Sequence, residues 1–177
     1  MTVRLQRLGA VTAAQLEDLA EVLQDCVQGG ASVSFMLPFS LDEARAFWRS
    51  VAEGVARGER ALVVAEVDGR IRGTVQLVLA QPPNQPHRAD LAKMLVHRRG
   101  RRRGVGAALM QAAEALAREC GKSLLVLDTA SAEAERLYQR AGWHYAGEIP
   151  GFALAPEGGL CATRLYYRQL PPTVQER

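Results

Sequence analysis

The sequence predicts a single α/β (α+β) domain in which a mixed sheet of about seven strands is flanked by about four helices. Apolar residues alternate or run continuously in seven short stretches, and they recur at helical spacing in four longer ones. A turn rich in arginine and glycine joins a strand to a helix, and a continuous apolar strand follows that helix. This order is typical of a right-handed βαβ unit with parallel strands.

The elements are predicted in the order β-αα-βββ-α-β-α-ββ. The seven strands are expected at residues 3–8, 60–67, 70–80, 88–96, 124–127, 143–149 and 161–169. The four helices are expected at about 13–28, 41–57, 104–120 and 132–141. No repeat or low-complexity tract interrupts this order, so residues 1–177 are predicted to form one domain.

Short local patterns set the ends of several elements. Thr12 and Ser40 are predicted N-caps, and Glu43 completes a capping box with Ser40. Asp68-Gly69 is predicted to be the tight turn of a hairpin. Proline and glycine are frequent in residues 150–159, which are therefore expected to be a loop.

The arginine-rich turn, residues 97–107, predicts a phosphate site. Gly104 and Gly106 remove Cβ atoms where the helix begins, and the first amides of a helix have no intrahelical partner. The simpler alternative is a solvated basic loop. No Gly-Lys-Ser/Thr follows, which excludes a P-loop, and the third glycine of a dinucleotide fingerprint is missing. A diphosphate bound without a metal is the remaining prediction.

The charge distribution argues against a nucleic-acid partner. The net charge is +3, and it would be negative without the five arginines at 98, 99, 101, 102 and 103. The basic character is therefore local to one turn and does not extend over a face.

Cysteine usage and hydropathy exclude several other classes. Cys26, Cys120 and Cys161 are far apart and form no CxxC pattern, so neither a disulfide framework nor a zinc site is expected. No apolar segment has the length of a signal peptide core or of a membrane span. A cytoplasmic protein with no membrane partner is the expectation.

Two segments give the chain a family resemblance. Arg101-Arg102-Arg103-Gly104-Val105-Gly106-Ala107 resembles the Arg/Gln-x-x-Gly-x-Gly/Ala signature with which the GNAT superfamily of N-acetyltransferases binds the pyrophosphate of acetyl-coenzyme A. Residues 134–143 resemble the family's Ala-x-x-x-Tyr-x-x-x-Gly-Phe segment, with Trp143 in the aromatic place. The resemblance covers essentially the whole chain and implies the GNAT fold.

The resemblance implies a set of residues that bind acetyl-CoA. Backbone amides of residues 103–107 would hold the diphosphate, the side chains of Arg98, Arg99, Arg101 and Arg102 would attract the phosphates, and the main chain of residues 94–96 would pair with the pantetheine arm. The expected set is Met94, Leu95, Val96, Arg101, Arg102, Arg103, Gly104, Val105, Gly106, Ala107, Ser131 and Tyr138. Ser131 stands where many relatives have asparagine.

Acetyl transfer to an amine needs a neutral nucleophile, stabilisation of an oxyanion and a proton for the leaving thiolate. The resemblance implies that Tyr138 is the acid, whereas a tyrosine on an apolar helix face is otherwise a core residue. Asp90 and Asp128 are the candidates for the base or the amine anchor, because an alkyl amine with a pKa of about 10 must lose a proton. Either could instead cap a loop or pair with an arginine. A backbone amide near Leu95 or Val96 is the expected oxyanion donor.

A narrower resemblance concerns the acceptor. Residues 29–36, 127–129 and 147–151 are similar to segments of acetyltransferases of the tabtoxin-resistance type. This implies a small-molecule amine as the substrate, such as an amino-acid-like toxin or antibiotic. The residues expected to bind it are Ser32, Phe35, Asp90, Asp128 and Glu148.

Other functions stay open at this point. A protein or peptide N-acetyltransferase would need a groove that accepts a peptide. A non-catalytic acyl-CoA or nucleic-acid binding module could have the same fold, although the presence of Tyr138 argues against one. An exposed closing strand at residues 161–169 leaves both a monomer and a homodimer open.

Overall fold

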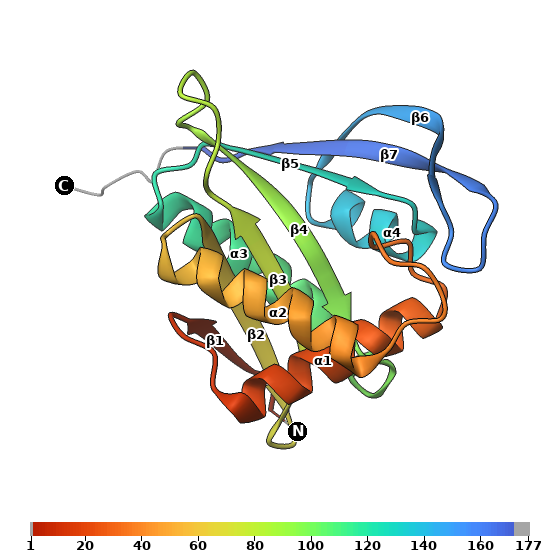
Figure 1. Ribbon diagram of the computed structural model, residues 1–177. Helices are drawn as coiled ribbons and strands as arrows, with labels where there is room; N and C mark the ends of the chain where they lie inside the picture. The colour runs from red at the N-terminus through yellow and green to blue at the C-terminus, as the bar shows by residue number, and fades with distance from the viewer. Residues whose placement is uncertain (1, 172–177) are drawn as a thin grey trace.

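Seven strands form one mixed sheet in the order β1-β2-β3-β4-β5-β7-β6 in the computed structural model, which describes residues 2–171 (Figure 1). The strands are β1 (Arg4–Leu8), β2 (Arg60–Val67), β3 (Arg70–Val78), β4 (Arg88–Val96), β5 (Leu124–Thr129), β6 (His144–Leu154) and β7 (Leu160–Gln169). The helices are α1 (Ala13–Gln28), α2 (Leu41–Ala56), α3 (Val105–Glu119) and α4 (Ala132–Arg140), with a short 3-10 helix η1 (Arg98–Gly100). The predicted fold class and element order are confirmed.

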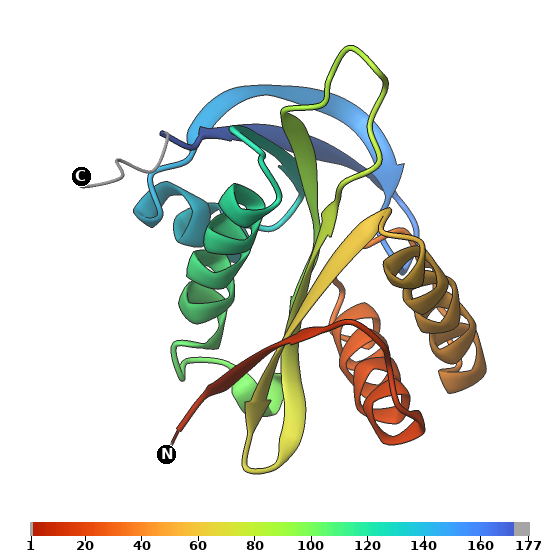
Figure 2. The ribbon, with the colours of Figure 1, turned by 90° about the vertical axis from the view of Figure 1, so that its left-hand side faces the viewer.

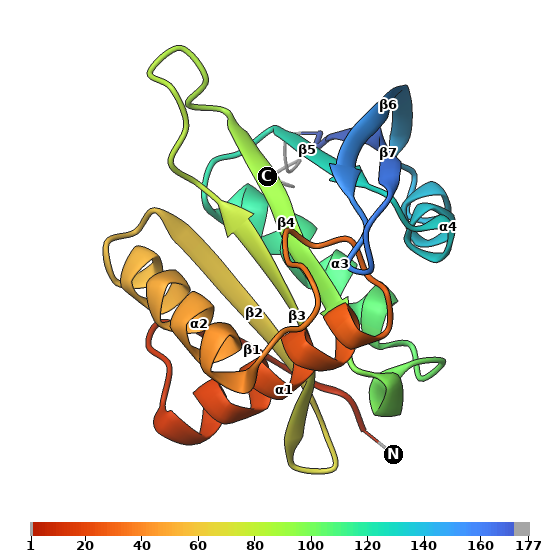
Figure 3. The ribbon, with the colours of Figure 1, turned by 45° about the vertical axis from the view of Figure 1, so that its right-hand side comes forward.

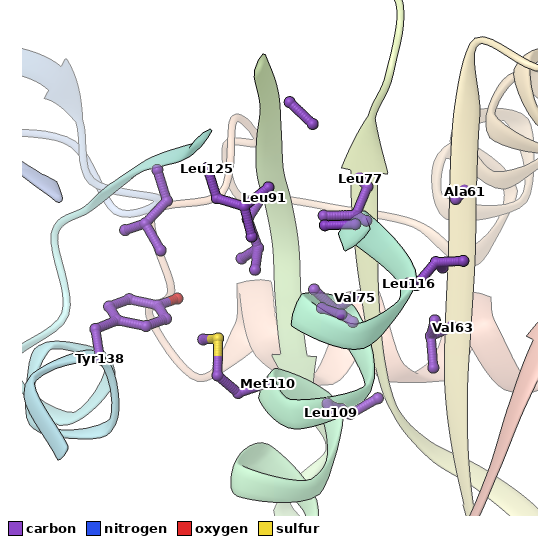
Figure 4. Close-up of a cluster of buried hydrophobic side chains, with 14 of the residues drawn as sticks. Ala61, Val63, Val75, Leu77, Leu91, Leu109, Met110, Leu116, Leu125 and Tyr138 are labelled. Carbon is purple, nitrogen blue, oxygen red and sulfur yellow. The ribbon is translucent and has the colours of Figure 1, made fainter. Parts of the chain in front are cut away.

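The helices cover both faces of the sheet. Figure 2 shows α3 on one face and α1 and α2 on the other. Each face has its own apolar core. Figure 4 shows the α3 side, where Leu109, Met110 and Leu116 pack against side chains of the central strands. The core under α1 and α2 contains Leu23 and the fully buried Trp48. Two packed faces hold the central strands, which carry the site, in fixed positions.

The local patterns act as predicted at several element ends. The Thr12 hydroxyl accepts the backbone N–H of Gln15 at 3.2 Å, and Ser40 and Glu43 form the expected capping box. Asp68 and Gly69 have φ values of +53° and +77°. Positive φ at both central positions is the geometry of a type I′ hairpin turn.

The structure corrects the prediction for the last two strands. The segment 150–159 is not all loop, because β6 continues through Pro150 to Leu154. Its register against β7 shifts between Ile149 and Ala153, which marks a bulge that accommodates the proline. The closing strand β7 lies between β5 and β6, so the exposed edge belongs to β6 and not to residues 161–169.

Within residues 2–171, no helix is both long enough and apolar enough to cross a membrane. The three cysteines are free thiols.

Candidate active site

A cleft opens where β4 and β5 separate. These two parallel strands pair from Arg88↔Leu124 to Asp90↔Val126 and then diverge (Figure 3). The cleft that includes this gap has a volume of about 1090 Å³. An unpaired strand edge offers main-chain groups to an extended ligand. The divergence therefore creates a binding edge on β4.

A β-bulge in β4 accompanies the divergence. The register between β3 and β4 shifts between Thr74 and Gln76, so that Lys93 and Met94 together face Val75. Lys93 has a φ of +50°, in the left-handed region. A bulge bends its strand and increases the local twist. The bend turns β4 away from β5 beside the cleft.

The predicted phosphate turn lines one part of the cleft. Gly104 is the N-cap of α3, has a φ of +74° and leaves the helix without a side-chain cap. The backbone N–H groups of Val105, Gly106 and Ala107 belong to the first helical turn, which has no intrahelical acceptors for them. All four residues line the cleft. The turn therefore presents uncapped amides and the positive end of the helix dipole to a ligand.

Two arginines of the turn line the cleft. Arg101 Nε donates to the carbonyl oxygen of Val96 at 3.1 Å, and Arg102 is exposed with a φ of +58°. The guanidinium of Arg103 lies 3.4 Å from the Asp68 carboxylate, and Arg103 is not among the lining residues. Of the five arginines of this turn, Arg101 and Arg102 are therefore the two that line the cleft beside the uncapped amides.

Arg98 and Arg99 do not join the cleft, contrary to the prediction. Arg98 donates to the Asp25 carboxylate through both its backbone N–H and its guanidinium. Both arginines line a separate polar pocket of about 350 Å³. A sequence pattern of five neighbouring arginines could not show this, because the carboxylate that binds Arg98 lies far away in the chain.

Tyr138 lies on α4 and lines the cleft. Its side chain packs against Trp143 and Tyr166, with ring centroids 5.9 and 6.1 Å away, and the residue is 4% exposed. In Figure 4 its hydroxyl points away from α4, toward β4. Burial, and secondarily the negative charge of Asp128, raises the pKa of Tyr138 well above its ordinary value. The phenol therefore keeps its proton throughout the physiological pH range.

Both predicted aspartates line the cleft, but their partners differ. Asp90 forms an ion pair with Arg88 and accepts a hydrogen bond from Gln81 Nε2 at 3.2 Å. Asp128 accepts a hydrogen bond of 2.7 Å from the Thr163 hydroxyl. Within residues 2–171, no cation forms an ion pair with Asp128. Its carboxylate therefore has the greater capacity to bind a further cation.

The connection between α1 and α2 contributes one of its two predicted acceptor-binding residues to the cleft. Ser32 lines the cleft as predicted. Phe35 does not, because its ring packs against Phe39 and Phe47 at centroid distances of 4.6 and 5.3 Å. The Phe35 side chain, which was expected to bind the acceptor, is therefore partly buried against Phe39 and α2 and lies outside the cleft.

Two further predicted residues have structural partners. Glu148 is not among the lining residues and forms an ion pair with Arg164 at 2.8 Å. Ser131 lines the cleft, but its hydroxyl accepts the backbone N–H of Ala134 and so caps α4. Glu148 therefore lies outside the cleft, and the hydroxyl oxygen of Ser131 is already engaged in capping α4.

Several residues that sequence reasoning missed also line the cleft, and Lys93 and Cys26 are two of them. Lys93 is the one charge within the apolar run 91–96, and that interruption was the available signal. Cys26, in the last turn of α1, donates its S–H to the Val96 carbonyl at 3.6 Å. Burial raises the pKa of the Cys26 thiol to about 11, so this group is uncharged and unreactive at neutral pH.

Comparison with known proteins agrees with this geometry. A model of the acetyltransferase (GNAT) family matches residues 16–143. An uncharacterized N-acetyltransferase from the hisH-hisA intergenic region of Azospirillum brasilense is 30% identical over 128 residues, which are 71% of this chain and 74% of the relative.

Solved structures show the same fold. A phosphinothricin acetyltransferase from Sinorhizobium meliloti, in complex with acetyl-CoA, has a TM-score of 0.79 at 18% identity, over 99% of this chain and 93% of its own. A ribosomal-protein-alanine N-acetyltransferase from Brucella melitensis has a TM-score of 0.76 at 19% identity, over 96% and 100%. This fold therefore occurs in proteins named for quite different acceptors.

The fold and the cleft are those of a protein that binds an extended, phosphate-bearing ligand where the strands β4 and β5 of one sheet separate. The chain belongs to the acetyltransferase (GNAT) family. Its enzyme class is that of an acetyl-CoA-dependent N-acetyltransferase, as the resemblance implied. Among residues 2–171, no group of three or more His, Cys, Asp or Glu side chains is placed to hold a metal ion.

Proposed function

We propose that this enzyme transfers the acetyl group of acetyl-CoA to the primary amine of a small molecule by direct attack. The observation that carries the proposal is the position of Tyr138 and Asp128 in one cleft. The first is a buried phenol that keeps its proton, and the second is a carboxylate without an ion pair in the described chain.

The donor side fits acetyl-CoA, which supplies the acetyl group as a thioester. Uncapped amides of residues 105–107 would bind the diphosphate, with Arg101 and Arg102 adding positive charge. The carbonyl of Val96 already accepts hydrogen bonds from Arg101 and Cys26. Leu95 lies opposite Thr74 in the ladder with β3, so its main-chain groups face β3. We therefore assign the pantetheine contacts to the main chain of Met94.

The acid and base roles follow from which side chain carries a proton and which can accept one. Asp128 accepts a proton from the bound ammonium, and the neutral amine then forms the C–N bond as the C–S bond breaks. The backbone N–H of Val96, which faces away from β3, stabilises the charge on the carbonyl oxygen. Tyr138 donates its proton to the sulfur. After the C–N bond forms, the nitrogen releases its second surplus proton to solvent, and solvent reprotonates Tyr138. Asp90 is the weaker candidate for the base because Arg88 and Gln81 already bind it.

The covering of the acceptor side supports a small substrate. The backbone N–H of Leu37, in the α1–α2 connection, donates to the carbonyl of Pro156, in the β6–β7 turn, at 2.9 Å. Figure 3 shows this connection passing in front of the end of β4. This hydrogen bond joins the α1–α2 connection to the β6–β7 turn, and the joined segments reduce the space that would be open to a peptide.

The narrower resemblance and the phosphinothricin acetyltransferase fold neighbour support an amino-acid-like acceptor, of the kind found among toxins and antibiotics. A cytoplasmic location and a monomeric or homodimeric state remain predictions.

A screen of small primary amines for acetyl-CoA-dependent release of free thiol tests the proposal. The panel should include amino acids, β-lactam analogues and short peptides. We expect turnover with small amines and its loss in Tyr138→Phe. Turnover with peptides alone would show a peptide acetyltransferase, and tight acetyl-CoA binding without any turnover would show a binding module.

A further inference from the structure

Lys93 occupies an unusual place in the cleft wall. Lys93 and Lys122 are the two lysines of the chain, and Lys93 lies in the bulge of β4 with a left-handed backbone. Its ammonium group donates to the Ser34 hydroxyl at 3.1 Å and lies 5.8 Å from the centroid of the Phe47 ring. These partners belong to the α1–α2 connection and to α2. The side chain therefore reaches the acceptor side of the sheet, opposite the face that packs on α3.

The charge of Lys93 has no counter-ion in this position. No carboxylate oxygen of residues 2–171 lies within 4.0 Å of its ammonium nitrogen, whose partners are a hydroxyl group and a ring face. Burial lowers the pKa of Lys93, while the nearby charge of Asp128 partly opposes that effect. A half-buried cation without an ion-pair partner is costly unless a ligand supplies the anion.

Asp128 has the complementary property. Its partner is the neutral Thr163 hydroxyl, and it lies close enough to influence Lys93 electrostatically. Of the two other carboxylates that line the cleft, Asp90 is neutralised by Arg88, and Glu133 lies in the first turn of α4. One negative and one positive side chain without ion pairs therefore lie at the same end of the cleft.

From this juxtaposition we infer that Lys93 binds a carboxylate or similar acidic group on the acceptor, while Asp128 binds the acceptor's ammonium group. The inference rests on the proposed function and narrows it to acceptors that carry both an amine and an acid. A charge-assisted hydrogen bond to Lys93 would favour such molecules over amines without the acid. Lys93 is then a residue that determines specificity.

Matched substrate pairs test this role. Each pair consists of an α-amino acid and its primary amide, for example methionine and methioninamide, and kcat/KM is measured for both by thiol release. The ratio of the two values is compared between enzymes, which cancels the difference in amine basicity within a pair. The ratio of acid to amide is expected to be about 10-fold higher in the wild type than in an enzyme without the Lys93 charge, equivalent to about 1.4 kcal/mol.

Three variants give the comparison. Lys93→Met is expected to reduce the ratio by about 10-fold, mainly through a higher KM for the acid. Lys93→Arg is expected to retain most of the preference because it keeps the charge. Lys122→Met is the matched control, since the Lys122 ammonium group donates to the carbonyl of Pro86 outside the cleft. It is expected to show the wild-type ratio.

The outcomes separate the inference from the proposed function. An unchanged ratio in folded Lys93→Met overturns the role of Lys93 and leaves the acetyltransferase standing. If no amine releases thiol, the proposed function fails. Calorimetric titration of methionine into enzyme loaded with desulfo-coenzyme A then decides the binding role. Heat with the wild type and none with Lys93→Met supports that role, whereas equal heats, or none with either enzyme, overturn it.

Discussion

Asp25, in the last turn of α1, accepts hydrogen bonds from both the backbone N–H and the guanidinium of Arg98 in η1. Asp25 is 8% exposed, whereas the Arg98 side chain is 63% exposed. The last turn of α1 contains no basic residue, so Arg98 brings the favourable cation from another segment. This contact attaches the turn that precedes α3 to α1, which lies on the opposite face of the sheet from α3.

Asp25→Ala is expected to lower the free energy of unfolding by about 2 kcal/mol, because charged hydrogen bonds to the turn are lost. Urea denaturation measures the change. Arg98→Ala should lower it less, since the backbone N–H of residue 98 still binds Asp25. An Arg98→Ala enzyme with a greatly raised KM for acetyl-CoA and unchanged stability would contradict this structural assignment and return Arg98 to the donor site.

Gly106→Leu is expected to abolish measurable acetyl-CoA binding. A Cβ at Gly106 would lie 3.2 Å from Leu137 Cδ2 on α4, and a leucine side chain would have to enter the cleft beside the helical amides. Gly106→Ala requires a shift of only a few tenths of an ångström and should weaken binding less. Calorimetric titration of both variants checks the order, and circular dichroism checks that they fold. Wild-type affinity in Gly106→Leu would remove the phosphate-cradle assignment.

Tyr138→Phe is expected to lower kcat by about 100-fold, with little change in the KM for acetyl-CoA, because it removes the proton donor and keeps the packing. The exposed Tyr145 provides the control, and Tyr145→Phe should behave as the wild type. Burial raises the pKa of Tyr138, so kcat of the wild type should not fall through loss of this proton up to about pH 10. A Tyr138→Phe enzyme with unaltered kcat would exclude the acid role.

Asp128→Asn is expected to reduce kcat/KM for the amine more than Asp90→Asn does, by about 100-fold against less than 10-fold. The reason is that Asp90 is already paired with Arg88, whereas Asp128 is available to the ammonium group. Raising the pH should restore part of the Asp128→Asn rate, since more of the free amine is then neutral. The reverse order of the two variants would make Asp90 the base.

The parts of the fold that depend on neighbours in the chain were predictable from the sequence. Capping at Ser40, the hairpin turn at Asp68 and the helix start at Gly104 depend on residues a few positions apart. The extension of β6 beyond Pro150 was not predictable, because the proline is tolerated only through a bulge against β7.

The site divides in the same way. The turn at Gly104 and the position of Tyr138 follow from two local segments. The binding of Arg98 by Asp25 joins residues far apart in sequence, and the direction of Lys93 depends on a bulge that breaks the alternation of β4. No local pattern contains that information.

The left-handed backbone of Arg102 links the stability of the folded protein to its affinity for acetyl-CoA. A φ of +58° suits glycine and costs about 1 kcal/mol for a residue with a Cβ, so the native state carries this energy permanently. Arg102→Gly should therefore raise the midpoint of thermal unfolding and weaken acetyl-CoA binding in the same molecule. A search for thermostable variants would be drawn to this substitution, and a search for catalytic efficiency would reject it.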